Sequence, residues 1–351
     1  MGDADPAAAA GGGAARRRPW MTPSHHAAAG RFRNPWPNGA LQRFSGVLRW
    51  QLDRLTKPLP AQPDPSVFRS VTPAFARPRA SEDRVVITWV GHASFLLQIG
   101  GLNVLTDPVW SERASPVAFA GPRRWVPPGI ALDALPPIDV VLISHNHYDH
   151  LDDATVRRLA ANEPGARWMV PLGLAPFLRA RGARQVLELD WWQEKGVDGV
   201  VIGCTPAQHF SARGFGDRNR TLWCGWALAS VARRVYFAGD TGYHPSFGAI
   251  ADRFGPFQAA LLPIGAYEPR WFMRPVHLNP EEAVQAFRDL VAARRPATGR
   301  PAVMVPMHWG TFKLTDEPMD EPPVRVARAW GAAGLALEDL WVLAHGESRT
   351  L

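Results

Sequence analysis

Residues 145–150 read HNHYDH and place three histidines and one aspartate within six positions. They follow directly on the apolar run 140–143, which is typical of a buried strand. In extended backbone His145 and His147 project to the same side, and a turn would swing Asp149 and His150 toward a second metal. Imidazole nitrogen and carboxylate oxygen both bind borderline metals such as zinc. The HxHxDH pattern therefore predicts a site for two divalent metals.

The alternative is a surface histidine cluster, or a tag-like tract of the kind that His25-His26 suggests. Two features favour the metal site. A carboxylate stands at a suitable offset within the motif, and the segment before it has the character of a buried strand.

Two metals need more ligands than one motif supplies, and three further apolar segments each end in a suitable residue. His209 follows residues 200–203, Asp240 follows 235–238, and His308 follows 302–305. The end of a strand is where a rigid sheet usually presents site residues. The natural assignment gives one metal three histidines, His145, His147 and His209. The other metal receives Asp149, His150 and His308, and Asp240 bridges the two metals.

These ligands require a layered body to position them. Short apolar runs predict strands over residues 84–90, 94–99, 102–105, 139–144, 200–203, 235–238, 259–263 and 302–305. Helical patterns lie at residues 152–159, 174–181, 280–293 and 323–331. Strands with interspersed helices imply an α/β fold, and we expect this compact domain to span residues 80–351.

The residues before this domain have a different composition. Residues 1–30 are rich in Ala and Gly, which predicts a disordered low-complexity tail. Residues 31–79 predict a basic amphipathic arm followed by a Pro-rich linker. Within the arm, residues 40–55 repeat apolar side chains at helical spacing: Leu41, Phe44, Leu48, Leu52 and Leu55. This apolar face would either pack on the body or meet a membrane.

The formal charge of +7 is concentrated in the arm, because residues 1–60 hold nine Arg and Lys against three Asp and Glu. A basic arm suits an anionic membrane surface, and the body has no nucleic-acid-binding motif, so we expect no nucleic-acid partner. No run of residues suggests a transmembrane helix or a signal peptide. Cys204 and Cys224 are expected to be reduced core residues of a cytoplasmic, peripherally membrane-associated protein.

With these residues assembled, the chain resembles the metallo-β-lactamase superfamily. Several segments are closer to one branch, the N-acylphosphatidylethanolamine-hydrolysing phospholipases D, and the likeness runs from about Arg31 to Arg349. The segments are WVGHAS, LTDPVWSERASP, ISHNHYDHLD, ELDWW, TPAQH, FAGDTGY, PIGAYEPRWFM, HWGTF and HGESR. HxHxDH marks only the superfamily, whereas PIGAYEPRWFM followed by HLNPEEA is more specific to the branch.

The resemblance implies an αββα four-layer sandwich with two Zn²⁺ per chain. It also implies that Tyr148 and His277 contact the phosphate region of the substrate, with Asp149 and His277 as the catalytic residues. The implied reaction is hydrolysis of N-acylphosphatidylethanolamine to phosphatidic acid and an N-acylethanolamine. The phospholipid and the membrane surface are then the expected partners, and a homodimer is compatible with this picture.

The chain departs from the branch at residues 118–121, at Phe210 where a Trp is expected, and at Lys313 where a small residue is expected. Acyl and headgroup preference therefore cannot be carried over. Because one metal site supports many chemistries, a hydrolase of a soluble phosphodiester, cyclic nucleotide or lactone is the alternative enzyme. A non-catalytic binding protein on the same scaffold is the third reading, and the intact ligand set disfavours it.

Overall fold

Most of the strands form two stacked sheets, in which successive side chains of a strand point to opposite faces. The computed structural model describes residues 25–36, 44–214, 216–292 and 301–351. The first sheet has seven strands: β3 (Val85–Gly91), β4 (Ser94–Ile99), β5 (Leu102–Thr106), β6 (Val140–Leu142), β7 (Arg167–Pro171), β8 (Gln185–Leu189) and β15 (Ser348–Thr350). Their order across the sheet is β15-β3-β4-β5-β6-β7-β8, with β5 to β8 mutually parallel.

The second sheet has six strands: β9 (Glu194–Val197), β10 (Val200–Thr205), β11 (Gly225–Ala229), β12 (Arg234–Phe237), β13 (Ala259–Pro263) and β14 (Val303–Met307). Their order is β14-β13-β12-β11-β10-β9, and β12, β13 and β14 run parallel. Parallel neighbours end at the same edge of a sheet, so residues that follow β12 and β14 emerge near one another.

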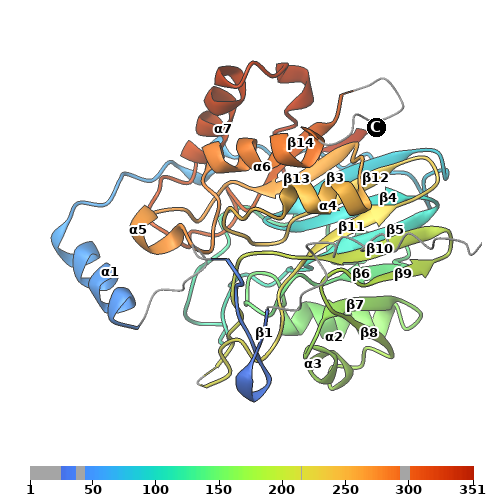
Figure 1. Cartoon of the computed structure of the whole chain (residues 1–351), viewed down its shortest axis with the longest axis horizontal. Coiled ribbons are helices and arrows are strands. Elements are labelled where there is room, and N and C mark those ends of the chain that lie inside the picture. Colours follow the sequence, from blue (N-terminus) through green and yellow to red (C-terminus); the bar gives the residue numbers. More distant parts are fainter. Residues whose placement is uncertain (1–24, 37–43, 215, 293–300) are drawn as a thin grey trace, which may run out of the picture.

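Helices cover the outer face of each sheet (Figure 1). The principal helices are α2 (Asp153–Asn162) and α3 (Ala175–Arg179) on the first sheet, and α4 (Phe247–Phe254), α6 (Pro280–Ala292) and α7 (Glu321–Ala332) on the second. Short helical turns occur at α5 (Arg270–Met273), Ala28–Gly30, Pro65–Val67, Leu132–Ala134 and Leu337–Asp339. The order of layers is helix, sheet, sheet, helix, which confirms the predicted αββα sandwich.

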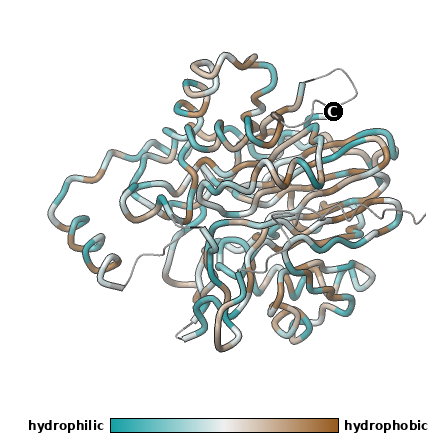
Figure 2. The backbone as a smooth tube through the Cα atoms, in the orientation of Figure 1, coloured by the Kyte–Doolittle hydropathy of each residue, from teal (hydrophilic) through white to brown (hydrophobic). Residues whose placement is uncertain are grey.

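Strand β6 and the residue that follows it contribute side chains to two hydrophobic cores. Val140 and Leu142 pack between the sheets, whereas Val141 and Ile143 pack under α2 and α3. Both faces are buried, so the run is continuously apolar instead of alternating. Figure 2 shows the same concentration of hydrophobic residues along the strands. Cys204 and Cys224 are both free and buried in this core, as expected.

Several elements were not anticipated from sequence. Strands β7, β8, β9, β11 and β15 and helix α4 have no counterpart among the predicted elements. The short strand β8 alternates exposed and half-buried residues at the sheet edge, and such a pattern is weak over five residues. In the part of the chain that the structure describes, none of the helices has the length and apolar character needed to cross a membrane.

The tail predicted for residues 1–30 includes six residues that the structure describes. Residues 1–24 lie outside the described residues, but His25 is 5% exposed and residues 26–32 form a hairpin. The hairpin pairs β1 (His26–Ala27) with β2 (Arg31–Phe32), and we call residues 25–36 the N-terminal strap. Ala/Gly composition predicted disorder here, and contacts with the distant body override it.

Helix α1 (Phe44–Thr56) confirms the predicted amphipathic helix from Phe44 onward, whereas residues 40–43, including Leu41, lie outside the described residues. The leucines of α1 do not pack on the body. Trp50 docks on the body: it donates from Nε1 to Asp316 Oδ2 at 2.6 Å and its ring lies 5.3 Å from that of Phe272. Arg54 Nε lies 3.1 Å from the other oxygen of Asp316. Leu48, Leu52 and Leu55 lie on the other side of the helix and are 52%, 62% and 83% exposed. Figure 1 shows α1 at the edge of the molecule, next to α5.

One buried histidine outside the candidate centre predicts acid sensitivity. His244 is stacked between Trp36 at 4.5 Å and Phe247 at 4.1 Å, and burial lowers its pKa to about 3. The folded state keeps His244 neutral, whereas the unfolded chain binds a proton below pH 6.5, so this contribution to stability is lost as pH falls from 6.5 toward 3. At pH 5 the loss is about 2 kcal/mol.

His244→Phe should remove that pH dependence while keeping the stacked ring. Denaturant unfolding of wild type and variant at pH 7.5 and 5.0 measures the difference. The variant should lose about 2 kcal/mol less than wild type over this interval. Equal losses in the two proteins would mean that His244 is not held neutral in the fold.

Candidate metal centre

The seven predicted ligands come together at one edge of the sandwich. His145, His147, Asp149 and His150 follow β6, and the other three follow three strands of the second sheet: His209 after β10, Asp240 after β12 and His308 after β14. Five of the seven are at most 3% exposed: His145, His150, His209, Asp240 and His308.

Backbone conformation at this edge is specific. Gly239 precedes Asp240 with φ 59°, and a Cβ there would lie 2.6 Å from the Ser144 Cβ and 2.7 Å from the Cys224 carbonyl oxygen. Only glycine lets the two strand ends approach so closely. His308 itself has φ 62°, a conformation that L residues adopt at a cost of about 1–2 kcal/mol and that is common at functional sites.

Three imidazoles form the first half of the centre. His147 Nδ1 lies 2.8 Å from His145 Nε2 and 3.1 Å from His209 Nε2. The other nitrogen of His209 lies 2.9 Å from the Val276 carbonyl oxygen, to which it donates as Nδ1–H. Burial, followed by the effect of neighbouring histidines, lowers the pKa of His147 to about 3, and burial lowers that of His209 to about 4. Neutral imidazoles thus point lone pairs at one place, as a metal requires.

Two carboxylates and two imidazoles form the second half. Asp149 Oδ2 lies 3.3 Å from His150 Nε2 and 3.4 Å from His308 Nε2. Asp240 Oδ2 lies 3.2 and 3.1 Å from the same two nitrogens. It also lies 3.8 Å from His209 Nε2, so Asp240 stands between the halves, where a bridging ligand would be.

The donor set fits divalent cations on two counts. Burial opposes charge on His308, yet the carboxylates of Asp240 and Asp149 raise its pKa to about 9, so these carboxylates demand a cation. In addition, Asp240 Oδ1, His150 Nε2 and His308 Nε2 are buried with no hydrogen-bond partner. Unpartnered buried polar atoms are costly, and a bound metal would satisfy them.

Asp107 is a site residue that the ligand assignment missed. It follows β5, is fully buried, and lies 2.7 Å through Oδ2 from His150 Nδ1. Its oxygens also accept from the backbone N–H of Ser144 at 2.6 Å and from the Ser144 hydroxyl at 2.5 Å. Asp107 therefore orients His150 and the start of the motif. The same strand-end rule that selected Asp240 would have selected it.

Asp107→Asn should weaken the centre without removing a ligand. The amide cannot accept from both Ser144 and His150 on two oxygens, and loss of such an orienting partner typically costs about 10- to 100-fold in metal affinity or activity. Competition with a chelating dye measures the metal affinity, and far-ultraviolet circular dichroism checks the fold. Wild-type affinity in a folded Asp107→Asn protein would contradict the orienting role.

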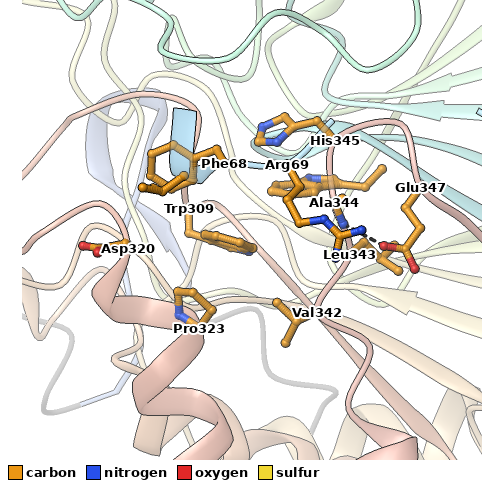
Figure 3. A pocket seen from close by; sticks show the side chains of 12 residues that line it. Phe68, Arg69, Trp309, Asp320, Pro323, Val342, Leu343, Ala344, His345 and Glu347 are labelled. Carbon is orange, nitrogen blue, oxygen red and sulfur yellow. Dashed lines mark hydrogen bonds between the residues drawn. The ribbon is translucent and has the colours of Figure 1, made fainter. Parts of the chain in front are cut away.

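His92 also supports the second half of the centre. Its Nε2 lies 2.9 Å from Asp149 Oδ2, and its ring lies 4.0 Å from that of His308. The hydroxyl of Thr311 accepts from the His92 backbone N–H at 2.8 Å and lies 3.0 Å from His345 Nε2. His345 and Trp309 in turn wall a cavity of about 260 Å³ (Figure 3). The cavity therefore lies beside the residues that hold His92, which in turn contacts Asp149. None of the residues that line the cavity is a predicted metal ligand.

His277 reaches the centre and Tyr148 does not offer its hydroxyl to it. His277 Nδ1 lies 3.9 Å from Asp240 Oδ2 and has no hydrogen-bond partner. The residue as a whole is 9% exposed. The Tyr148 hydroxyl instead donates to the Arg213 carbonyl oxygen at 2.6 Å, and the Arg213 guanidinium lies 4.0 Å above its ring. The phenol proton is thus used within the protein, and the predicted contact of Tyr148 with the substrate stays a prediction.

An apolar cluster adjoins the centre. Trp50, Met273 and Val276 pack together with the partly buried rings of Phe210, Trp271 and Phe272. The ring of Phe210 lies 4.5 Å from that of His147, and the Val276 carbonyl oxygen accepts from His209. The cluster is therefore in direct contact with two predicted ligands. Of the sequence departures, Phe210 is thus at the centre, whereas the Lys313 ammonium is bonded to the Glu317 carbonyl oxygen.

Comparison with known proteins places this geometry in a family. Residues 102–309 match the model described as the beta-lactamase superfamily domain, which is more than half of the chain. The chain belongs to the β-lactamase superfamily. Its fold and its assembled donor set make it a metallo-β-lactamase-fold hydrolase with candidate metal-binding clusters.

Two relatives and one solved structure show which known proteins the chain is similar to. It is 44% identical over 244 residues to N-acyl-phosphatidylethanolamine-hydrolyzing phospholipase D 1 of Caenorhabditis elegans, covering 67% of this chain and 66% of that one. It is 32% identical to a metal-dependent hydrolase of Methanopyrus kandleri, covering 75% and 98%. The structure of Igni18, a metallo hydrolase from Ignicoccus hospitalis, shares the fold with a TM-score of 0.56, 24% identity, and coverage of 76% and 98%.

Proposed function

We propose that this chain is a zinc-dependent phospholipase D that hydrolyses N-acylphosphatidylethanolamine to phosphatidic acid and an N-acylethanolamine. The observation that carries the proposal is the junction of two features. A buried set of three neutral imidazoles and a mixed carboxylate set adjoins an apolar cluster that includes Trp50 of α1, and the opposite face of that helix carries the exposed leucines. The identity to a relative named for this reaction supports the same substrate.

In the proposal, His145, His147 and His209 hold one metal, and Asp149, His150 and His308 hold the other, with Asp240 shared. Metals bound there would attract a phosphodiester anion and lower the pKa of bound water toward neutrality. The seven side chains would hold the metals and the substrate in a fixed orientation, because they follow directly on rigid strands.

His277 is proposed to serve the leaving group. Burial lowers the pKa of His277 well below its usual range, so the imidazole is neutral at pH 7 and carries one N–H. Its Nδ1 has no partner inside the protein, so the ring is free to donate from one nitrogen and accept at the other. When the bond between phosphorus and the ethanolamide oxygen breaks, that oxygen takes up the proton that the attacking water releases. The neutral His277 ring would relay this proton by accepting it at one nitrogen and donating from the other.

The membrane is the proposed partner of α1. Leu48, Leu52 and Leu55 present an apolar face away from the body, and the Arg49 side chain on the same helix is 66% exposed, whereas Arg54 is paired with Asp316. An exposed apolar stripe with a basic side chain beside it is typical of helices that lie in the interface of an anionic membrane. On the opposite face of the helix, Trp50 belongs to the apolar cluster beside the centre, so α1 would hold that cluster close to the membrane surface.

The test is an assay on detergent-dispersed N-acylphosphatidylethanolamine beside phosphatidylcholine, phosphatidylethanolamine and bis(p-nitrophenyl) phosphate, with metal content measured on the same sample. Release of N-acylethanolamine with preference over ordinary phospholipids is expected. Turnover of only the soluble diester would indicate the alternative hydrolase of a soluble phosphodiester or lactone. A folded protein with well under one metal per chain would overturn both enzyme proposals.

A further inference from the structure

A second group of metal-binding side chains lies outside the centre. His25 and His26 open the N-terminal strap, and Asp190 lies in the turn between β8 and β9. His25 Nε2 lies 2.7 Å from one oxygen of Asp190, and His26 Nε2 lies 2.7 Å from the other. The potential ligand atoms of the three residues all lie within 4.8 Å of one another. This arrangement joins residues that are more than 160 positions apart in sequence.

Packing holds these side chains in place before any ligand binds. The ring of His25 stacks on Trp191 at 4.2 Å, and the ring of His26 meets Phe32 edge-on at 5.2 Å. Asp190 accepts from the backbone N–H of Trp191 at 2.8 Å through Oδ1. Preorganised ligands lower the cost of binding, because less side-chain freedom is lost.

The donor types select a class of metal. Two imidazole nitrogens and one carboxylate suit zinc and similar borderline ions, whereas calcium and magnesium prefer oxygen ligands throughout. The His26 side chain is 43% exposed, so water can complete the coordination. A metal would replace the two Nε2 protons that the imidazoles otherwise share with Asp190.

We propose that His25, His26 and Asp190 form a structural site for Zn²⁺ or a similar ion, separate from the candidate centre, which fastens the N-terminal strap to the body. We call this group the strap site. The assignment does not depend on the substrate proposed above, since the strap site contains none of the residues assigned to the reaction.

The strap reaches the centre at its other end. Asn34 donates from Nδ2 to the His209 carbonyl oxygen at 2.9 Å and accepts from the His209 N–H at 3.2 Å. Phe32 donates its backbone N–H to the Asn219 carbonyl oxygen at 2.8 Å, which fixes the middle of the strap. A metal at the strap site would therefore steady the backbone of His209 from a distance, through one continuous segment.

The test uses the full chain with the centre loaded with Zn²⁺ and free metal removed by gel filtration. Calorimetric titration with Zn²⁺ then compares wild type with His26→Phe, which keeps the ring against Phe32, and with Asp190→Asn, which keeps a hydrogen-bond acceptor. Asp198→Asn, an exposed carboxylate paired with Arg167, is the matched control. Wild type and control should bind an additional equivalent of Zn²⁺ that both strap-site variants have lost.

A second readout keeps the test independent of catalysis and of the folding of any one variant. Added Zn²⁺ should slow proteolytic cleavage within residues 25–36 in wild type and have no effect in His26→Phe. The proposal is overturned if wild type binds no additional equivalent, or if the additional equivalent survives in both strap-site variants. Neither readout contains substrate, so failure here leaves the proposed phospholipase activity untouched, and the reverse also holds.

Discussion

Asp149→Asn should abolish turnover and reduce metal content while leaving the fold in place. Asp149 Oδ2 faces three imidazoles, those of His92, His150 and His308, and its carboxylate supplies negative charge to the second half of the centre. The amide is nearly the same size but neutral, so it binds a divalent cation poorly. Because even orienting residues typically cost about 10- to 100-fold, loss of a direct ligand should reduce turnover by more than about 100-fold.

Metal analysis, steady-state turnover and thermal unfolding on one preparation decide the outcome. Asp133→Asn is the control, since Asp133 is an exposed carboxylate that pairs with Arg158 on the surface. The control should behave as wild type in all three measurements. A folded Asp149→Asn protein with full metal content and full turnover would remove this residue, and with it the second half of the proposed centre.

Replacing Leu48, Leu52 and Leu55 together with glutamine should detach the protein from vesicles. These side chains are 52%, 62% and 83% exposed, so their replacement removes little from the folded body, and glutamine preserves helix propensity. If each leucine transfers roughly half of its surface into lipid, the loss is about 1 kcal/mol per residue, or about 100-fold in partitioning for the three.

Sedimentation with vesicles containing phosphatidylserine measures this partitioning. A triple variant at Val231, Val324 and Leu337, which are also exposed but lie on other elements, is the matched control. Turnover of a soluble phosphodiester should be unchanged in both variants, because the leucines lie outside the centre. Unaltered vesicle binding by the leucine variant would exclude α1 as the membrane contact.

The candidate ligands could be assembled from sequence because each predicted ligand or ligand motif follows an apolar strand. His209, Asp240 and His308 were assigned on that rule, and the structure brings them beside the HNHYDH motif. Asp107 obeys the same rule, yet it was not chosen, because a ligand count alone gives no reason to look for an orienting carboxylate.

What could not be predicted depends on which face or atom points where. Helical spacing identified the leucine stripe of α1 but not that Trp50, on the opposite face, would dock instead. The phenol of Tyr148 is spaced like a site residue, and only the position of the Arg213 carbonyl reveals that its proton is used elsewhere. Both outcomes depend on contacts between segments far apart in sequence, about which local patterns carry no information.

The bond between Asn34 and His209 also bears on how the protein matures on the ribosome. The strap leaves the exit tunnel early, but its anchor points at Asp190, His209 and Asn219 are made more than 150 residues later. His308 follows later still, so neither the strap nor the ligand set can be completed until most of the chain has been synthesised. A nascent chain therefore carries an undocked amino-terminal segment through much of its translation, and metal loading belongs to the last stage of its assembly.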